Sequence, residues 1–167
     1  MATPDALHAA KNGRLVVFVD DFIGSGDQFL TTWQNVDTGT SFEAIQQVSC
    51  FPAIYISLVG TTTGIDNIGQ LAPTVAVCVS HKIDDRGTFW GIKLSNVLLY
   101  NELDLLLKKY ASRLTPHESY MKQQNFLVYG YKHRGLFFGF EHSVPDATLP
   151  IFWCRGTENW EPLIERT

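Results

Sequence analysis

The chain has 167 residues, of which 45% are hydrophobic and 18% are charged, so it can form a folded core. Its net charge of −4 lacks the basic character that direct nucleic-acid binding requires. The three cysteines are odd in number and lie far apart, and no run of 18 apolar residues occurs. We therefore expect a cytoplasmic protein with reduced thiols, no membrane span and no zinc site.

The first half of the sequence alternates apolar strands with helical segments. Strands are expected at 15–19, 53–59 and 75–80, helices at 6–11, 27–36 and 42–48, and a loop with one helical turn at 60–71. Continuous Val, Ile and Ala runs are typical of parallel strands that are covered on both faces. We therefore expect an α/β fold, with a mostly parallel sheet and helices on both faces.

The second half has a different pattern. Residues 101–114, "NELDLLLKKYASRL", predict an amphipathic helix. The aromatic, glycine-bounded segments 126–131 and 136–140 predict a hairpin or a pair of edge strands, and the tail predicts an extended, packed loop. We expect residues 1–167 to form a single domain whose C-terminal aromatic segments add edge strands to the sheet.

The stretch "RLVVFVDDFIGSGDQF", residues 14–29, contains the candidate site. Two acids follow the apolar run, and a small-residue turn then leads into a helix: Asp20 and Asp21, then Gly24, Ser25 and Gly26, then Asp27. Ligands of open α/β sheets bind at the carboxyl ends of the strands. A carboxylate there can accept two hydrogen bonds from a vicinal diol, and backbone N–H groups at a helix start can hold a phosphate. The pattern therefore predicts a site for ribose 5-phosphate.

This stretch resembles the phosphoribosyl-pyrophosphate motif of type I phosphoribosyltransferases. That motif has an apolar strand, two acids, two apolar residues, a small or acidic residue, Thr, Gly, any residue and Thr. Ser25 stands for the first Thr and Gly26 matches, whereas Gln28 replaces the final Thr and Gly24 replaces an aspartate of some members. The resemblance implies a ligand-binding set, with Mg²⁺ bound only together with the ligand: Asp20, Asp21, Gly24, Ser25, Gly26, Asp27 and Gln28.

Three other interpretations of the acidic strand remain open. The first is a plain strand-turn-helix without a ligand. The second is a Walker B-like strand end, although no G-x-x-x-x-G-K-[ST] segment accompanies it. The third is the acid pocket of a receiver-like domain, which needs a lysine on a later strand, and Lys82 follows the expected strand at 75–80.

The tail carries a second resemblance. "FLVYGYKHRGLFFGFEHSVPDATLPIFW", followed by "WEPLIER", is similar to the C-terminus of a phosphoribosyltransferase-like family of prokaryotic conflict and antiphage systems. The matching residues are His142, Pro145, Asp146, Thr148, Leu149, Pro150, Trp153, Trp160, Pro162 and Leu163. The resemblance implies a protein of nucleotide metabolism that acts in antiviral defence. The alternative is a hydrophobic C-terminal strap without chemistry.

Type I phosphoribosyltransferases carry a strand, a pyrophosphate loop and a flexible lid before the motif, whereas 14 residues precede Leu15 here. Phosphoribosyl transfer needs Mg²⁺ and hydrogen-bond donors on the leaving pyrophosphate. We therefore expect little turnover by the isolated chain, and no catalytic residue is assigned. The alternative function is a catalytically degenerate assembly subunit that binds a protein partner in a larger complex.

Overall fold

The structure is a computed structural model that describes residues 4–157 and 159–164. Its contacts divide the chain into two compact units, Met1–Ile83 and Asp84–Thr167, and each is described by itself. Within the described ranges, no helix is both long enough and apolar enough to cross a membrane.

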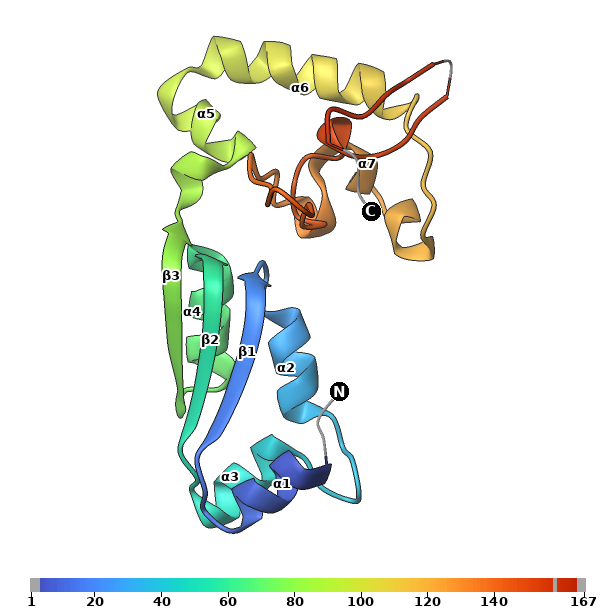
Figure 1. Ribbon diagram of the computed structural model, residues 1–167. Coiled ribbons are helices and arrows are strands. Elements are labelled where there is room, and N and C mark those ends of the chain that lie inside the picture. Colours follow the sequence, from blue (N-terminus) through green and yellow to red (C-terminus); the bar gives the residue numbers. More distant parts are fainter. Residues whose placement is uncertain (1–3, 158, 165–167) are drawn as a thin grey trace. The chain divides into compact units, whose positions relative to one another are not determined.

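The first unit is built on a three-stranded parallel sheet in the order β1-β2-β3 (Figure 1). Its strands are β1 (Val16–Ile23), β2 (Ala53–Thr61) and β3 (Val75–Ile83). Its helices are α1 (Pro4–Lys11), α2 (Asp27–Gln34), α3 (Phe42–Ser49) and α4 (Thr62–Leu71). The predicted α/β class and parallel sheet are confirmed, and most of the loop expected at 60–71 is the helix α4.

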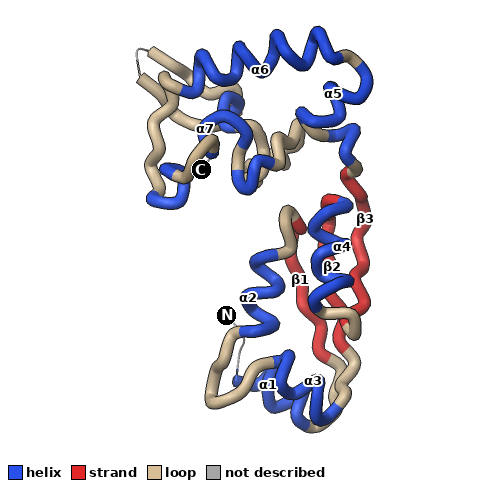
Figure 2. The backbone as a smooth tube through the Cα atoms, turned by 180° about the vertical axis from the view of Figure 1, so that it is seen from behind, coloured by secondary structure: helices blue, strands red, loops and turns tan. Residues whose placement is uncertain are grey.

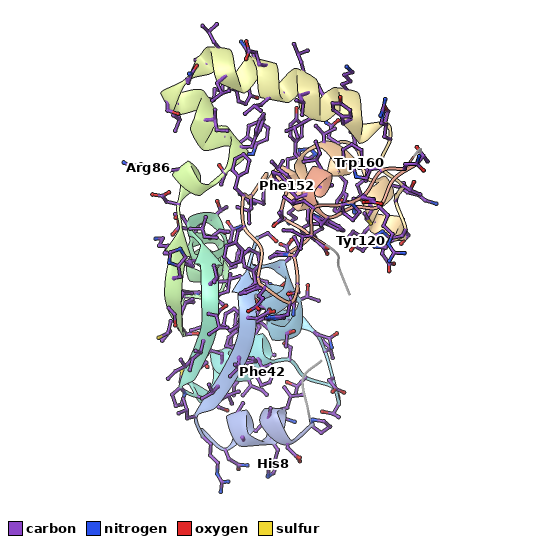
Figure 3. The ribbon with its side chains drawn as sticks, turned by 45° about the horizontal axis from the view of Figure 1, so that its top comes forward. His8, Phe42, Arg86, Tyr120, Phe152 and Trp160 are labelled. Carbon is purple, nitrogen blue, oxygen red and sulfur yellow. The ribbon has the colours of Figure 1, made fainter. Side chains whose placement is uncertain are left out.

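Aromatic side chains form the core between the sheet and its helices. Phe18 and Tyr55 are paired in register on β1 and β2, and both point toward α2. The Phe29 ring stacks on Tyr55, with ring centroids 4.4 Å apart, and Trp33 stacks on Phe42. Phe42 is fully buried, whereas His8 on α1 is exposed (Figure 3). This packing fixes the amino end of α2 against the sheet, because large aromatic rings bury much apolar area.

Among the described residues of the first unit, no helix lies over the opposite face of this sheet, so the expectation of helices on both faces is wrong for this part of the chain. Val19 is 76% exposed and Leu58 is 58% exposed, and both point away from the core. In keeping with this, α4 lies behind the strands in Figure 1 and in front of them in Figure 2. Right-handed crossovers between strands laid down in the order 1-2-3 place every connecting helix on the same face.

The second unit is helical and irregular. It contains α5 (Phe89–Ser95), α6 (Val97–Ala111) and α7 (Phe126–Tyr129), with 3-10 turns at 85–87, 119–122, 131–133 and 150–152. The predicted aromatic edge strands are wrong. Residues 126–129 form the short helix α7, and residues 136–140 make isolated bridges at Leu136 and no strand. Gly130 ends α7, because its φ of 77° is not helical. The position requires glycine, since an added Cβ would lie 2.7 Å from the Thr148 carbonyl oxygen.

The tail motif forms much of the core of the second unit. Trp153 is buried, and its indole N–H donates to the Thr148 carbonyl oxygen at 3.2 Å. Leu149 packs with Phe89 and Tyr129 in a neighbouring apolar cluster. The exposed members of the motif include His142, whose ring stacks on Phe140. The role that the structure gives the buried part of this motif is packing.

A small polar cluster lies on the inner side of α6. The Tyr129 hydroxyl donates to one carboxylate oxygen of Asp104 at 2.5 Å, and Lys108 Nζ donates to the other at 2.7 Å. Burial raises the pKa of Asp104, but the hydrogen bonds from Lys108 and Tyr129 outweigh it, so the pKa lies below its ordinary value. The same cluster raises the pKa of Tyr129 to about 12, first through burial and then through the bond to Asp104.

Candidate functional site

The two acids of the candidate site lie within β1, which continues two residues past them to Ile23. Successive side chains of a strand leave it on opposite faces, so Asp20 and Asp21 start from different faces of the sheet. Asp20 is half-buried on the helix-covered face, whereas Asp21 is exposed on the open face. The acids thus lie two residues before the end of the strand and start from opposite faces of it, but they are not independent, because the Asp21 side chain helps to raise the pKa of Asp20.

Asp20 is held by the neighbouring strand. The Tyr55 hydroxyl donates to one oxygen of its carboxylate at 2.8 Å, and the Asp21 backbone N–H donates to the other at 3.0 Å. Burial raises the pKa of Asp20, and these two hydrogen bonds oppose that increase. The pKa of Tyr55 is raised in turn, by burial first and then by its bond to the carboxylate. The Asp20 carboxylate is therefore a half-exposed hydrogen-bond acceptor that these two bonds hold in place.

The turn between β1 and α2 depends on two glycines that face each other. Gly26 has φ of 85°, a left-handed conformation that favours glycine, and an added Cβ would lie 2.9 Å from the Gly64 carbonyl oxygen. An added Cβ on Gly64 would lie 2.3 Å from the Gly24 carbonyl oxygen. The backbone of the turn therefore packs directly on the first turn of α4.

Two side chains from the β2–α4 connection fix the turn further. The Thr61 hydroxyl donates to the Gly24 carbonyl oxygen and accepts from the Gly64 N–H at 3.0 Å, so it caps α4 at the same time. Asn67 Nδ2 donates to the Ser25 carbonyl oxygen at 3.0 Å. These bonds hold the carbonyl groups of the turn toward α4.

The start of α2 carries no side-chain cap, because its N-cap residue is Gly26. Ser25 is buried, and its hydroxyl donates to the Asp27 carboxylate at 2.7 Å. Gln28 is exposed in the first turn of the helix. Backbone N–H groups at a helix start attract anions, but the Asp27 carboxylate places a negative charge beside them.

Within the described part of the chain, no three His, Cys, Asp or Glu side chains come together as a metal site. Lys82, which a receiver-like pocket would need, is exposed, and no ion pair joins it to either acid of β1 in the described residues. The candidate site therefore consists of the turn before α2 and the two neighbouring carboxylates of β1.

Sequence reasoning brought together the residues of β1 and α2 but missed those of β2 and α4. Tyr55, Thr61, Gly64 and Asn67 all contact the candidate site, and none was singled out. The run "GTTTG", residues 60–64, contains a local signal, because Thr is a preferred helix N-cap residue and its side-chain oxygen can accept from the N–H three residues later. Tyr55 could not be found in this way, since it lies 35 residues from Asp20.

A comparison with known protein families shows which family this chain belongs to. The PRTase-CE family model matches residues 1–166. The chain belongs to the PRTase-CE family. This is a phosphoribosyltransferase-like family, and the match runs through both units of the structure, from the strand with the two acids to the tail motif.

Outside this family match, the comparisons add little. No curated protein matches the sequence. Among solved structures, the AQ2163 protein from Aquifex aeolicus is 15% identical, with a TM-score of 0.36, and the alignment covers 45% of this chain and 32% of that one. The aligned part is thus about a third of that structure.

Proposed function

We propose that this PRTase-CE protein binds a phosphoribosyl ligand such as phosphoribosyl pyrophosphate, with its 5-phosphate at the start of α2. The observation that carries the proposal is the left-handed Gly26, which packs on Gly64 and begins α2 as an N-cap residue with no side chain. The Asp27 N–H donates instead to the Ser25 hydroxyl oxygen, at 3.4 Å. Such a helix start is suited to a phosphate. Gln28 flanks it and would add an amide donor, and the Ser25 hydroxyl would donate to the phosphate in place of its present bond to the Asp27 carboxylate.

The acids of β1 would take the ribose hydroxyls. Asp21 is exposed and can accept hydrogen bonds directly, whereas Asp20 has accepted two within the protein and offers its remaining lone pairs. Mg²⁺ would arrive with the ligand and be held mainly by phosphate oxygens, since one carboxylate and phosphates suffice for this ion. The proposal includes no resident metal.

Calorimetric titration with phosphoribosyl pyrophosphate and Mg²⁺ tests this proposal. We expect binding by the wild type, weaker binding by Asp21→Asn, and an intermediate loss for Asp20→Asn, because Tyr55 still holds the amide in place. Asp5→Asn, the same charge change on exposed Asp5 of α1, serves as the matched control and should bind like wild type. An absence of heat at millimolar ligand, or equal binding by all variants, would refute the site.

A second candidate function, an assembly subunit, is favoured by the open face of the sheet. Parallel sheets are normally covered on both faces, and the exposed apolar side chains include Val17, Val19, Ile56 and Leu58. In this case the protein would be one component of a cytoplasmic prokaryotic defence complex, a role supported by the resemblance of the tail motif. Folded protein that releases no heat with the ligand, but forms a stable complex with a protein encoded by a neighbouring gene, would favour this function.

A further inference from the structure

The outer side of α6 carries leucines that the described residues of the second unit leave exposed. Its inner side packs through Tyr100, Leu103 and Leu107 on α7 and on residues 150–152. On the outer side Leu98 is 77% exposed and Leu105 is 69% exposed. The outer side chains of α6 point away from the rest of this unit (Figure 3). An apolar helix side of this kind is typical of an interaction surface.

The charges beside these leucines are arranged for pairing with an identical helix. At 100° per residue, Glu102, Leu105, Leu106 and Lys109 lie on one side of α6. Glu102 and Lys109 are equally distant in sequence from the midpoint between Leu105 and Leu106. A two-fold axis through that midpoint would therefore place Glu102 of each copy opposite Lys109 of the other.

Both charged side chains are available for such pairs. Glu102 is exposed, and the described residues show no ion pair that involves it. The neighbouring Lys108 is paired with Asp104 instead. Lys109 Nζ lies 5.4 Å from the centroid of the Tyr110 ring, a contact that leaves its charge in place. A parallel pair would instead oppose each charge to itself, so the pattern selects the antiparallel arrangement.

We propose that two copies of this chain associate through α6, crossing antiparallel at Leu105 and Leu106, with two Glu102–Lys109 pairs beside the crossing. This surface lies outside the proposed ligand site, so the dimer and ligand binding stand or fall separately. A contact limited to one 15-residue helix per copy is small, which predicts a weak dimer with a dissociation constant on the order of micromolar.

Sedimentation equilibrium of the full chain, over about a hundredfold range of concentration, tests this proposal. Leu105→Asp should raise the dissociation constant at least tenfold, because it places a charge at the apolar crossing. Leu163→Asp is the matched control, since Leu163 is 79% exposed in the same unit but lies outside α6. Circular dichroism checks that each variant is folded.

Charge exchange gives the sharper test. Glu102→Lys and Lys109→Glu should each weaken the dimer by about threefold to tenfold, and the double variant should restore it. Several results would overturn the proposal: a monomer at all concentrations, a dimer that survives Leu105→Asp, or single charge variants that the double variant does not rescue. A monomer that binds phosphatidylglycerol vesicles through α6 would also overturn it, by assigning these leucines to a lipid surface.

Discussion

Replacing Gly64 with alanine should destabilise the protein, although alanine is the better helix former. Gly64 lies in the first turn of α4, where its missing side chain lets the β1–α2 turn approach the helix. An added Cβ would lie 2.3 Å from the Gly24 carbonyl oxygen and 2.9 Å from Ile23 Cγ2. The carbonyl group cannot retreat freely, because the Thr61 hydroxyl bonds to it.

The expected change in the free energy of unfolding is the sum of one stabilising and two destabilising contributions. Alanine gains about 1 kcal/mol of helix propensity over glycine. Forcing a methyl group into a packed site typically costs about 1–3 kcal/mol, and losing the Thr61 bond to Gly24 would add about 1 kcal/mol. We therefore expect Gly64→Ala to lower the free energy of unfolding by about 1–3 kcal/mol and to weaken binding of ribose 5-phosphate.

Gly69→Ala is the matched control on the same helix. Nothing lies within 4 Å of the Cβ position at Gly69, so this variant should gain about 0.5–1 kcal/mol of stability and bind ligand normally. Urea unfolding followed by circular dichroism, with calorimetry of ligand binding, measures both variants. Equal stabilisation by the two substitutions would refute the inference that the Gly24–Gly64 contact holds the turn.

Three further predictions concern charged groups. Tyr55→Phe should cost about 1–2 kcal/mol at neutral pH, because it removes a hydrogen bond to a carboxylate, and it should raise the pKa of Asp20 further. Urea midpoints measured across pH should therefore show a loss that grows as Asp20 ionises; a loss independent of pH would contradict this. Asp104→Asn should cost about 1 kcal/mol at pH 7, and because the pKa of Asp104 is lowered in the folded state, thermal melts should show this difference vanishing as pH falls well below 3.8. Asp27→Asn should tighten ribose 5-phosphate about fivefold in calorimetry, since it removes about 1 kcal/mol of charge repulsion at the helix start, and weaker binding would count against a phosphate there.

Local patterns were sufficient to predict most elements of the first unit. The apolar runs at 15–19, 53–59 and 75–80 correspond to β1, β2 and β3, and the small-residue turn before Asp27 leads into a helix as expected. Periodicity and helix-start signals act within about ten residues, so they can be read from the sequence alone. In the second unit the same reasoning located α6 but mistook the aromatic segments for strands, because aromatic side chains pack equally well on short helices.

Local sequence was enough to predict the alternation of strands and helices, the acids of β1, the Gly24–Gly26 turn and the resemblance to a phosphoribosyltransferase-like family. The folded chain was needed to show that the described helices of the first unit share one face of the sheet, because strand order follows from contacts between distant segments. The fold also shows that Asp20 and Asp21 start from opposite faces of β1 and that Tyr55 and Gly64 contact the candidate site. Those partners lie tens of residues away in sequence, and no local pattern contains the pairing that brings them together.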